Sequence, residues 1–324
     1  MTREDIISYL EPFWGRTLSF MKEALRSDVP LLDSVNESVA GASGKMLRPM
    51  MSLLVARAIG TPNDDSCRYA SACELLHNAT LMHDDVADES SRRRGRPTVS
   101  ALLGPSAAVL VGDFWLSKAV ELAANSQHFV KVVKIFSKSL TDLAEGEMFQ
   151  MEKAGSCDTD EEDYYRIIKC KTASLFEAAG VSGACSVDAG EAEVEAVRNF
   201  SVLYGMAFQI KDDILDYTGT DELGKPLGVD LREKKITLPL LGALRNLPES
   251  ERARVRRMIC EADKRPEYCR QLRELTLSSG GIEYALARLD EFVGRAIEAL
   301  GAFADTPARE CLVYIARQNA HRRI

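Results

Sequence analysis

The chain has 324 residues, 46% of them hydrophobic, which is enough to bury a large core. Its formal net charge of −8 argues against a nucleic-acid-binding protein, whose surface would normally be basic. The eight cysteines form no CxxC pair, so they indicate reduced thiols rather than a zinc site or a disulfide framework. No apolar stretch approaches the ~20 residues of a transmembrane helix, and the first residues do not resemble a signal peptide. We therefore expect a soluble, cytoplasmic protein.

Helical periodicity dominates the sequence. Amphipathic stripes begin at Ile6 and at Leu53, and long helices are predicted over residues 66–87 and 191–217. Three more helices are expected between them, over 105–122, 128–152 and 161–180, and the pattern continues, with breaks, after Pro239. Turn-forming residues predict loops at 41–45, 90–97, 155–160 and 219–230. Because no segment predicts a strand and no linker divides the chain, we expect one all-α domain over residues 1–324.

Two aspartate clusters share one spacing, and each lies near the end of a long predicted helix. Four positions separate the first and last carboxylates of a cluster, which places them on one helix face. Like charges at this spacing weaken a helix, whereas a divalent cation held by carboxylates, water and phosphate would stabilise them. The alternative is two solvated acidic helix ends, but the repeat in apolar surroundings favours a two-sided Mg²⁺ clamp on a phosphorylated ligand. The candidate ligands are Asp84, Asp85, Asp88, Asp212, Asp213 and Asp216.

Basic residues near the first cluster are suited to binding phosphate. Guanidinium groups bind phosphate in a bidentate manner, and we assign this role to Arg93 and Arg94, leaving Arg92 and Arg96 as solvated residues. Three weaker candidates are Lys45 and Arg48, at a predicted helix start, and His77, two helical turns before Asp84. The histidine is as well explained by core packing as by ligand binding.

The second half of the chain also contains polar residues that are candidates for substrate binding. Lys171 and Thr172 interrupt an apolar helical pattern, and a lysine in such a place needs an anionic partner. Gln209 precedes Asp212 by three positions and faces the same way. Lys225 and Lys235 flank the loop after the second cluster, although a solvated lysine is the ordinary alternative for each.

Together these motifs closely resemble the trans-isoprenyl diphosphate synthases over nearly the whole chain, and most of all a long-chain polyprenyl diphosphate synthase. The resemblance rests on residues 44–49, 74–88, 93–98, 112–114, 145–147, 171–173, 209–216 and 235–239. It implies the class I isoprenoid synthase fold, a helical bundle with a central active-site cavity. It also implies head-to-tail condensation of an allylic prenyl diphosphate with isopentenyl diphosphate, and a homodimer formed through the helices of residues 105–152.

The resemblance also assigns roles to the candidate residues. Mg²⁺, three ions with substrate bound, would bridge the allylic diphosphate to the aspartates, with Asp84, Asp88 and Asp212 as direct ligands and the others acting partly through water. The same diphosphate would be held by Arg93, Lys171, Lys225 and Lys235. Isopentenyl diphosphate would be bound by Lys45, Arg48, His77 and Arg94. Thr172 and Gln209 would direct oxygen dipoles at the allylic carbocation.

Two small residues suggest a long product. Ala79 and Thr80 lie about one turn before Asp84, where bulky aromatic residues stop chain growth in short-chain members of the family. Small side chains leave an apolar tunnel, so we expect a product longer than geranylgeranyl diphosphate. Phe114 and Trp115 are candidates for a deeper wall, with ordinary core packing as an equal alternative.

Other functions are compatible with parts of this pattern. A short-chain farnesyl or geranylgeranyl diphosphate synthase shares both aspartate clusters. A class I terpene cyclase shares one aspartate-rich helix but has no need of a second diphosphate site. A non-catalytic synthase subunit usually lacks some of the aspartates, and a purely structural helical protein needs none of them.

Overall fold

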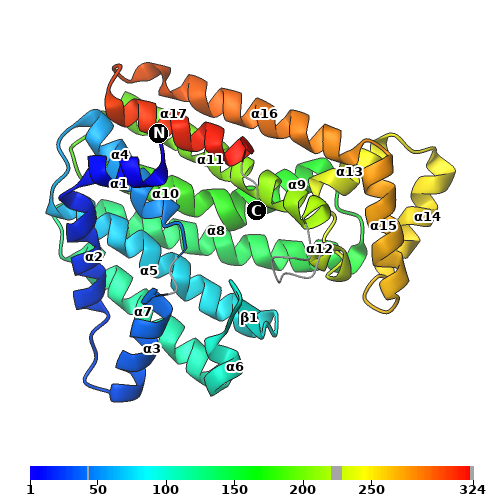
Figure 1. Cartoon of the computed structure of the whole chain (residues 1–324), viewed down its shortest axis with the longest axis horizontal. Helices are drawn as coiled ribbons and strands as arrows, with labels where there is room; N and C mark the ends of the chain where they lie inside the picture. The colour runs from blue at the N-terminus through cyan, green and yellow to red at the C-terminus, as the bar shows by residue number, and fades with distance from the viewer. Residues whose placement is uncertain (42–43, 220–227, 322–324) are drawn as a thin grey trace. The chain divides into compact units, whose positions relative to one another are not determined.

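Nearly all regular structure in this chain is helical, as the computed structural model shows (Figure 1). It describes residues 1–41, 44–219 and 228–321. The elements in chain order are α1 (Arg3–Leu10), α2 (Phe13–Ala24), α3 (Pro30–Gly41), α4 (Leu47–Ile59), α5 (Asp64–Ala87), β1 (Arg92–Arg93), β2 (Arg96–Pro97), α6 (Val99–Leu103), α7 (Pro105–Ala124), α8 (Phe129–Ser156), α9 (Glu161–Ile168), a π-helical turn η1 (Lys169–Ala173), α10 (Ser174–Cys185), α11 (Glu191–Thr218), α12 (Val229–Arg232), α13 (Leu238–Arg245), α14 (Glu249–Cys260), α15 (Pro266–Ser278), α16 (Gly281–Ala299), a 3₁₀ turn η3 (Leu300–Ala302) and α17 (Pro307–His321). The all-α prediction is confirmed.

The chain divides into two compact units. The first unit contains residues 1–138, 175–198 and 300–314, and the second contains residues 139–174, 199–299 and the chain from residue 315 on. The first aspartate cluster belongs to the first unit and the second cluster to the second unit. The expectation of a single domain stays a prediction.

Helix α5 is the centre of the first unit, and α7 runs along it (Figure 1). A capping box at Asn63 starts α5, because the Asn63 side chain accepts from the Ser66 N–H while the Ser66 hydroxyl accepts from the Asn63 N–H. Small residues let the two helices approach closely, and a Cβ on Gly112 of α7 would collide with the His83 ring of α5. Most α5 side chains before Asp84 are therefore buried, which fixes the helix that carries the first cluster.

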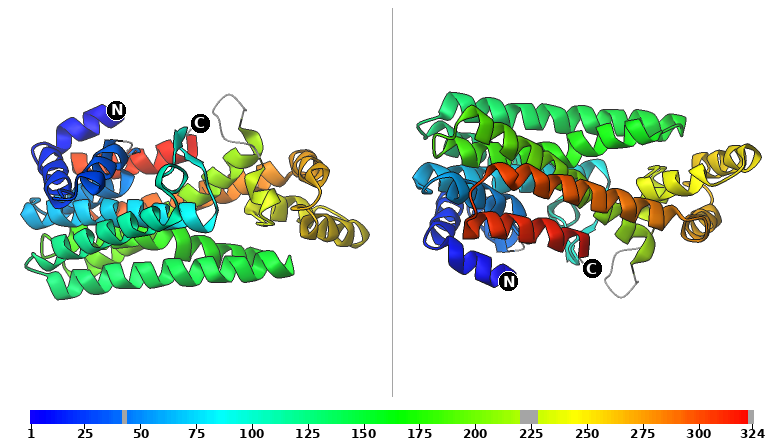
Figure 2. Two further views of the ribbon diagram at one scale, coloured as in Figure 1. Left: turned by 90° about the horizontal axis from the view of Figure 1, so that it is seen from below. Right: turned by 90° about the horizontal axis from the view of Figure 1, so that it is seen from above.

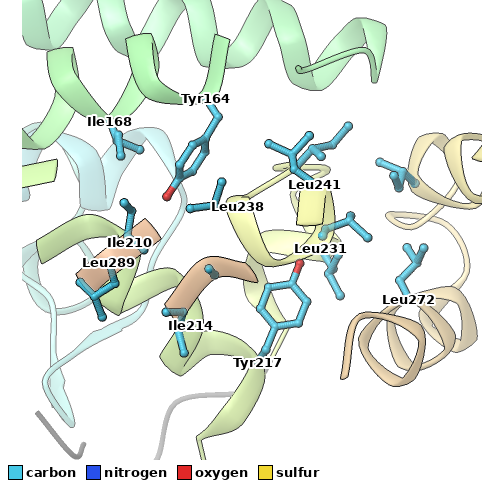
Figure 3. Packing of buried hydrophobic residues seen from close by; sticks show 14 of the residues in the cluster. Tyr164, Ile168, Ile210, Ile214, Tyr217, Leu231, Leu238, Leu241, Leu272 and Leu289 are labelled. Carbon is cyan, nitrogen blue, oxygen red and sulfur yellow. The ribbon is translucent and has the colours of Figure 1, made fainter. Parts of the chain in front are cut away.

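The second unit has its own core, shown in Figure 3. Ile210, Ile214 and Tyr217 of α11 contribute to it, and so do Leu238 of α13 and Leu289 of α16. Helices α14 and α15 lie side by side in the same unit (Figure 2). Burial of this face of α11 holds the helix that carries the second cluster.

The predicted helices agree well with the structure. Helices α7, α8 and α11 begin within one residue of their predicted starts, and α5 begins two residues early because the capping box lies there. The segment predicted as one helix over 161–180 is helical but is divided by the π turn at 169–173. The loop predicted from residue 155 begins later, because α8 continues to Ser156.

The loop predicted at 90–97 contains a detail that was not predicted: the two-residue strands β1 and β2 form a small antiparallel hairpin within it. Arg92 pairs with Pro97 and Arg93 with Arg96. The turn residues Arg94 and Gly95 both have positive φ, 52° and 76°, the conformation of a type I′ turn that suits two-residue hairpins. So short a ladder produces no alternating pattern that could be detected in the sequence.

Within the described residues, no helix is both long enough and apolar enough to cross a membrane.

Candidate active site

The first aspartate cluster lies at the C-terminal end of α5. Asp88 caps the helix, and its N–H donates to the Asp84 carbonyl at 2.8 Å. Asp84 is partly exposed and Asp88 is exposed, whereas Asp85 is only 5% exposed. The outer two carboxylates of the cluster are thus the ones that solvent and ligands can reach.

The buried carboxylate of Asp85 is held by Arg93 of the hairpin. The Arg93 Nε donates to Asp85 Oδ1 at 2.8 Å. Burial raises the pKa of Asp85, and the Arg93 charge acts in the opposite direction. The hairpin itself is attached to the end of α5, because the Ser90 N–H donates to the Asp85 carbonyl and the Thr98 hydroxyl donates to the Ser90 carbonyl. The structure therefore brings Arg93 beside the first cluster, as the sequence predicted.

Arg94 points toward the segment that precedes α4. Its guanidinium lies against Gly44, where a Cβ would be 2.7 Å from Arg94 Cζ. The exposed Lys45 is the next residue, and α4 begins at Leu47 after Met46 adopts a left-handed conformation with φ 50°. Arg48, in the first turn of α4, stacks on Phe176 with its Cζ 4.3 Å from the ring centroid. The structure thus brings two distant segments of the first unit together, the hairpin with Arg94 and the segment that carries Lys45 and Arg48.

His77 is surrounded by positive charge. Burial lowers its pKa well below the ordinary value, and Arg48, Arg94 and Arg93 lower it further. The imidazole is therefore neutral at neutral pH and can donate one hydrogen bond to a phosphate oxygen while carrying no charge.

Glu74 is a member of this group that the residue patterns did not single out. Its side chain is 2% exposed, and burial raises its pKa while Arg48 and Arg94 act to lower it. Asn78 donates to Glu74 Oε1 at 3.3 Å. A buried carboxylate near two arginines offsets their mutual repulsion before any phosphate binds. The one sequence signal that could have identified Glu74 is its position about one helical turn before His77, on the same helix.

The predicted product-length residues are also in the first unit. Ala79 is 1% exposed, and Thr80 is buried with its hydroxyl donating to the His77 carbonyl. Trp115 is fully buried, and its indole N–H donates to Asn36 Oδ1 at 2.8 Å, which agrees with the packing alternative for this residue. Phe114 is partly exposed and stacks with Lys118.

The second aspartate cluster shows the same pattern of exposure as the first. Asp212 and Asp216 of α11 are partly exposed, whereas Asp213 is 3% exposed. Both oxygens of Asp213 accept hydrogen bonds, one from the Tyr164 phenol at 2.6 Å and one from the Gln209 amide at 2.8 Å. In each cluster, therefore, the middle carboxylate is buried and bound to protein donors, whereas the outer two residues are at least partly exposed.

Lys171 and Thr172 lie in the π turn η1, where the Ser174 N–H reaches back to the Lys169 carbonyl. Such turns are often found at functional sites. Gly146 of α8 allows close contact with η1, because a Cβ there would be 2.6 Å from Cys170 Cβ. Lys171 forms an ion pair with Glu147 of α8. The partner anion that an intrahelical lysine needs is thus present within the protein.

A cavity of about 120 Å³, open to solvent, lies in the second unit. Its lining brings together five residues predicted from the sequence, namely Lys171, Thr172, Gln209, Asp213 and Lys235. Lys235 forms an ion pair with Glu233. Lys225 lies outside the described residues.

Two lining residues of this cavity, Asp230 and Tyr164, were missed by sequence reasoning. Burial and then Asp216 raise the pKa of Asp230, while burial and then Asp230 raise the pKa of Asp213. The sequence pattern places Asp230 at the end of a predicted loop and Tyr164 in a predicted helix, and it assigns neither residue a functional role. Neither belongs to a motif, so no signal in a single sequence distinguishes them from ordinary polar residues.

The accessible carboxylates suit Mg²⁺. Each cluster offers two hard oxygen donors one helical turn apart, Asp84 with Asp88 and Asp212 with Asp216. This number leaves coordination positions for water and phosphate oxygens, which is how Mg²⁺ is usually bound beside a phosphorylated substrate. Burial first, and the neighbouring carboxylates second, raise the pKa values of Asp213 and Asp230, and a bound cation would favour the charged form of both acids.

Comparisons with known proteins agree with this arrangement. The all-trans-nonaprenyl-diphosphate synthase (geranyl-diphosphate specific) of Rhodobacter capsulatus is 39% identical over 318 residues, 97% of this chain and 96% of its own. The octaprenyl diphosphate synthase of Escherichia coli is 38% identical over 299 residues, 91% of each chain. A solved structure of a polyprenyl synthase from Caulobacter crescentus, complexed with calcium and isoprenyl diphosphate, has 35% identity and a TM-score of 0.91, with 100% of this chain and 98% of that chain covered.

The structural similarity confirms the predicted isoprenoid synthase fold. A family model described as polyprenyl synthetase matches residues 29–276, which include both aspartate clusters and every candidate substrate-binding residue. The chain belongs to the polyprenyl synthetase family.

Proposed function

We propose that this protein is a long-chain trans-polyprenyl diphosphate synthase. It condenses an allylic prenyl diphosphate head-to-tail with successive isopentenyl diphosphate units. The observation that carries the proposal is the repeated cluster geometry: in each unit the middle aspartate is buried, beside Arg93 in the first unit and in a cavity with Lys171 and Lys235 in the second, and the outer aspartates are at least partly exposed. The long product is supported by the relatives named as octaprenyl and nonaprenyl diphosphate synthases.

The allylic diphosphate is held by the aspartate clusters and their neighbouring cations. Asp84, Asp88, Asp212 and Asp216 would hold Mg²⁺, three ions with substrate bound, and Arg93, Lys171, Lys225 and Lys235 would contact phosphate oxygens. The metal, when bound, supplies positive charge that stabilises the diphosphate as a leaving group. Lys171 would exchange Glu147 for a phosphate oxygen, since both are anionic partners for the same ammonium group.

Isopentenyl diphosphate is held by the basic group of the first unit. Lys45, Arg48 and Arg94 supply the charge, and the neutral His77 supplies a hydrogen bond. The negative charge of the whole protein opposes an anionic substrate, so this local concentration of arginine is what makes binding favourable.

The reaction proceeds by ionisation, condensation and loss of a proton. The allylic C–O bond breaks, and its electron pair leaves with the diphosphate. The double bond of isopentenyl diphosphate then attacks the allylic carbocation to form the new C–C bond. The released diphosphate accepts the proton lost from the isopentenyl unit, which creates the new trans double bond. The oxygen atoms of Thr172 and Gln209 stabilise the carbocation electrostatically.

The small buried side chains of Ala79 and Thr80 support a long product. An aromatic ring at either position would add a large obstacle one turn from the metal ligands. Without it, each added unit buries more apolar surface at roughly 25 cal/mol per Å², which favours continued growth within an apolar tunnel.

The enzyme acts as a homodimer in the cytoplasm under this proposal. The dimer is supported by exposed apolar side chains on α7, where Leu110 is 68% exposed and Val120 is 44% exposed. Leu102 of the preceding helix α6 is also exposed. Apolar side chains gathered in this way are typical of protein–protein interfaces.

The decisive experiment supplies the purified chain with Mg²⁺, a farnesyl or geranylgeranyl diphosphate primer, and isopentenyl diphosphate. Consumption of both substrates with release of diphosphate supports the synthase. Cyclisation of the allylic substrate alone would identify a terpene cyclase. Absence of turnover by the single chain would support the non-catalytic subunit instead.

A further inference from the structure

We propose that Tyr164 is a positioning residue that sets the direction of a hydrogen-bond chain ending at the Thr172 hydroxyl. The inference rests on the proposed function, because it concerns the groups that face the allylic carbocation. It assigns a role to a residue outside every motif of the sequence, and gives the buried Asp213 a task other than direct metal binding.

The chain of hydrogen bonds runs through three helical segments of the second unit. The Tyr164 phenol of α9 donates to Asp213 Oδ2 at 2.6 Å. The Gln209 amide, one turn before Asp213 on α11, donates to Asp213 Oδ1 at 2.8 Å. The Thr172 hydroxyl of η1 donates to Gln209 Oε1 at 2.7 Å. All four side chains line the cavity of this unit.

Each bond in this chain fixes the direction of the next. The phenol holds the Asp213 carboxylate by Oδ2, and in this orientation Oδ1 faces α11 and accepts from the Gln209 amide nitrogen. An amide that directs its nitrogen to Asp213 must direct its oxygen away from it, toward Thr172. The Thr172 proton is then committed to Gln209, so the lone pairs of the hydroxyl oxygen remain for the cavity. A reversed chain would direct a hydroxyl proton at the carbocation instead.

Tyr164 is well suited to hold the start of this chain. Its ring is 3% exposed and belongs to the core cluster of the second unit, pointing from α9 toward Ile210 of α11 (Figure 3). The adjacent Tyr165 packs against it with ring centroids 5.5 Å apart. Because packing already restricts the rotamers of the Tyr164 side chain, its hydrogen bond to Asp213 is formed before substrate binds. Substrate binding then costs little further side-chain entropy at this residue.

The neighbouring tyrosine provides a matched control. Tyr165 is on the same helix and also donates to a carboxylate, Glu161 Oε1 at 2.9 Å. Glu161 is not part of the cavity lining, whereas Asp213 is. Tyr164→Phe and Tyr165→Phe therefore remove the same atom from adjacent positions, and only the first breaks the chain that leads to Thr172.

The test is a double-mutant cycle in steady-state condensation assays. Tyr164→Phe should lower kcat about tenfold, because misdirected dipoles weaken transition-state stabilisation, while the KM values of both substrates and the Mg²⁺ midpoint change less than about threefold. Tyr165→Phe should keep the wild-type kcat. In the Thr172→Val background, Tyr164→Phe should have no further effect, since the hydroxyl it directs is gone.

Unnatural side chains at the same position separate direction from packing. Replacing Tyr164 by 4-aminophenylalanine keeps a donor at the ring end and should restore kcat, whereas 4-methylphenylalanine should behave like Tyr164→Phe. Additive losses in the cycle, equal losses in the two phenylalanine variants, or a wild-type kcat for Tyr164→Phe would overturn the inference while leaving the synthase assignment intact. An inactive wild-type enzyme would instead overturn the proposed function and the inference with it.

Discussion

The Nε of Arg93 lies 2.8 Å from Oδ1 of Asp85, so the middle carboxylate of the first cluster is paired with a cation of the protein itself. The middle carboxylate of the second cluster, Asp213, is likewise engaged, in this case by Tyr164 and Gln209. Both middle residues are buried, and the outer residues of both clusters are at least partly exposed. The two clusters thus share one arrangement, in which the middle carboxylate is bound by protein side chains, and we propose that the outer carboxylates hold the metal.

This division predicts different losses for the two kinds of aspartate. Asp84→Asn should raise the Mg²⁺ concentration for half-maximal activity about tenfold or more, because a ligand loses its charge. Asp85→Asn should change that midpoint less than about threefold, and raise the KM of the allylic substrate about tenfold as Arg93 loses its partner. Mg²⁺ titrations of both variants check this. Equal shifts of the Mg²⁺ midpoint in the two variants would mean that Asp85 binds the metal as directly as Asp84 does.

The contact between Gly44 and Arg94 predicts a specific defect in the binding of isopentenyl diphosphate. In Gly44→Ala the new Cβ would lie 2.7 Å from Arg94 Cζ, so the guanidinium must move. Because the side chain is flexible, the melting temperature should hardly change, whereas the KM for isopentenyl diphosphate should rise about tenfold. Gly41→Ala, where nothing lies within 4 Å, is the matched control. Similar KM values for the two variants would remove Arg94 from the substrate site.

His77 should make the folded protein sensitive to mild acid. Its pKa is depressed in the folded state and near 6.5 in the unfolded state, so below about pH 6.5 the unfolded chain binds a proton that the folded chain resists. The free energy of unfolding should therefore fall as pH drops from 7 toward the folded-state pKa.

Thermal unfolding between pH 5 and 8 tests this prediction. His77→Gln should lose less stability than the wild type over the acidic part of the range. The arginines near His77 stay charged throughout, and Glu74, whose raised pKa acts in the opposite sense, is present in both proteins. Parallel curves for the two proteins would show that His77 is not the group responsible.

Ala79 should control product length. Ala79 is only 1% exposed, so a phenylalanine ring at this position would have to occupy the space proposed for the growing chain. Ala79→Phe should therefore shorten the main product by several isoprene units. The overpacking should also cost about 1–3 kcal/mol of stability, so the assay is run well below the melting temperature. Ala79→Ser retains the space and should retain the profile. An unchanged product distribution in Ala79→Phe would place the wall elsewhere.

The sequence predicted the helices and the clusters because both depend on local spacing. Residues four apart share a helix face in any context, so Asp84 with Asp88 and Asp212 with Asp216 could be paired before the structure was known. The predicted start of α11 at residue 191 agrees with the structure for the same reason. Arg93 and Arg94 could be predicted because they belong to a run of arginines a few residues after the first cluster.

Contacts that depend on tertiary packing could not be predicted. Tyr164 reaches Asp213 across 49 positions of the chain, and only the packing of α9 on α11 brings them together. Glu74 and Asp230 owe their raised pKa values to burial, which spacing alone does not reveal. The hairpin at Arg94 depends on two positive φ values, one of them at a residue that rarely adopts such a conformation.

The most direct test of the whole account measures the chain length of the product. The purified enzyme is incubated with labelled isopentenyl diphosphate and a geranylgeranyl primer, with Mg²⁺ or with a chelator, and the products are separated by chromatography and identified by mass. We expect all-trans polyprenyl diphosphates longer than the primer, formed only when Mg²⁺ is present. A primer recovered unextended in the presence of Mg²⁺, or extension that continues in the chelator, would contradict it.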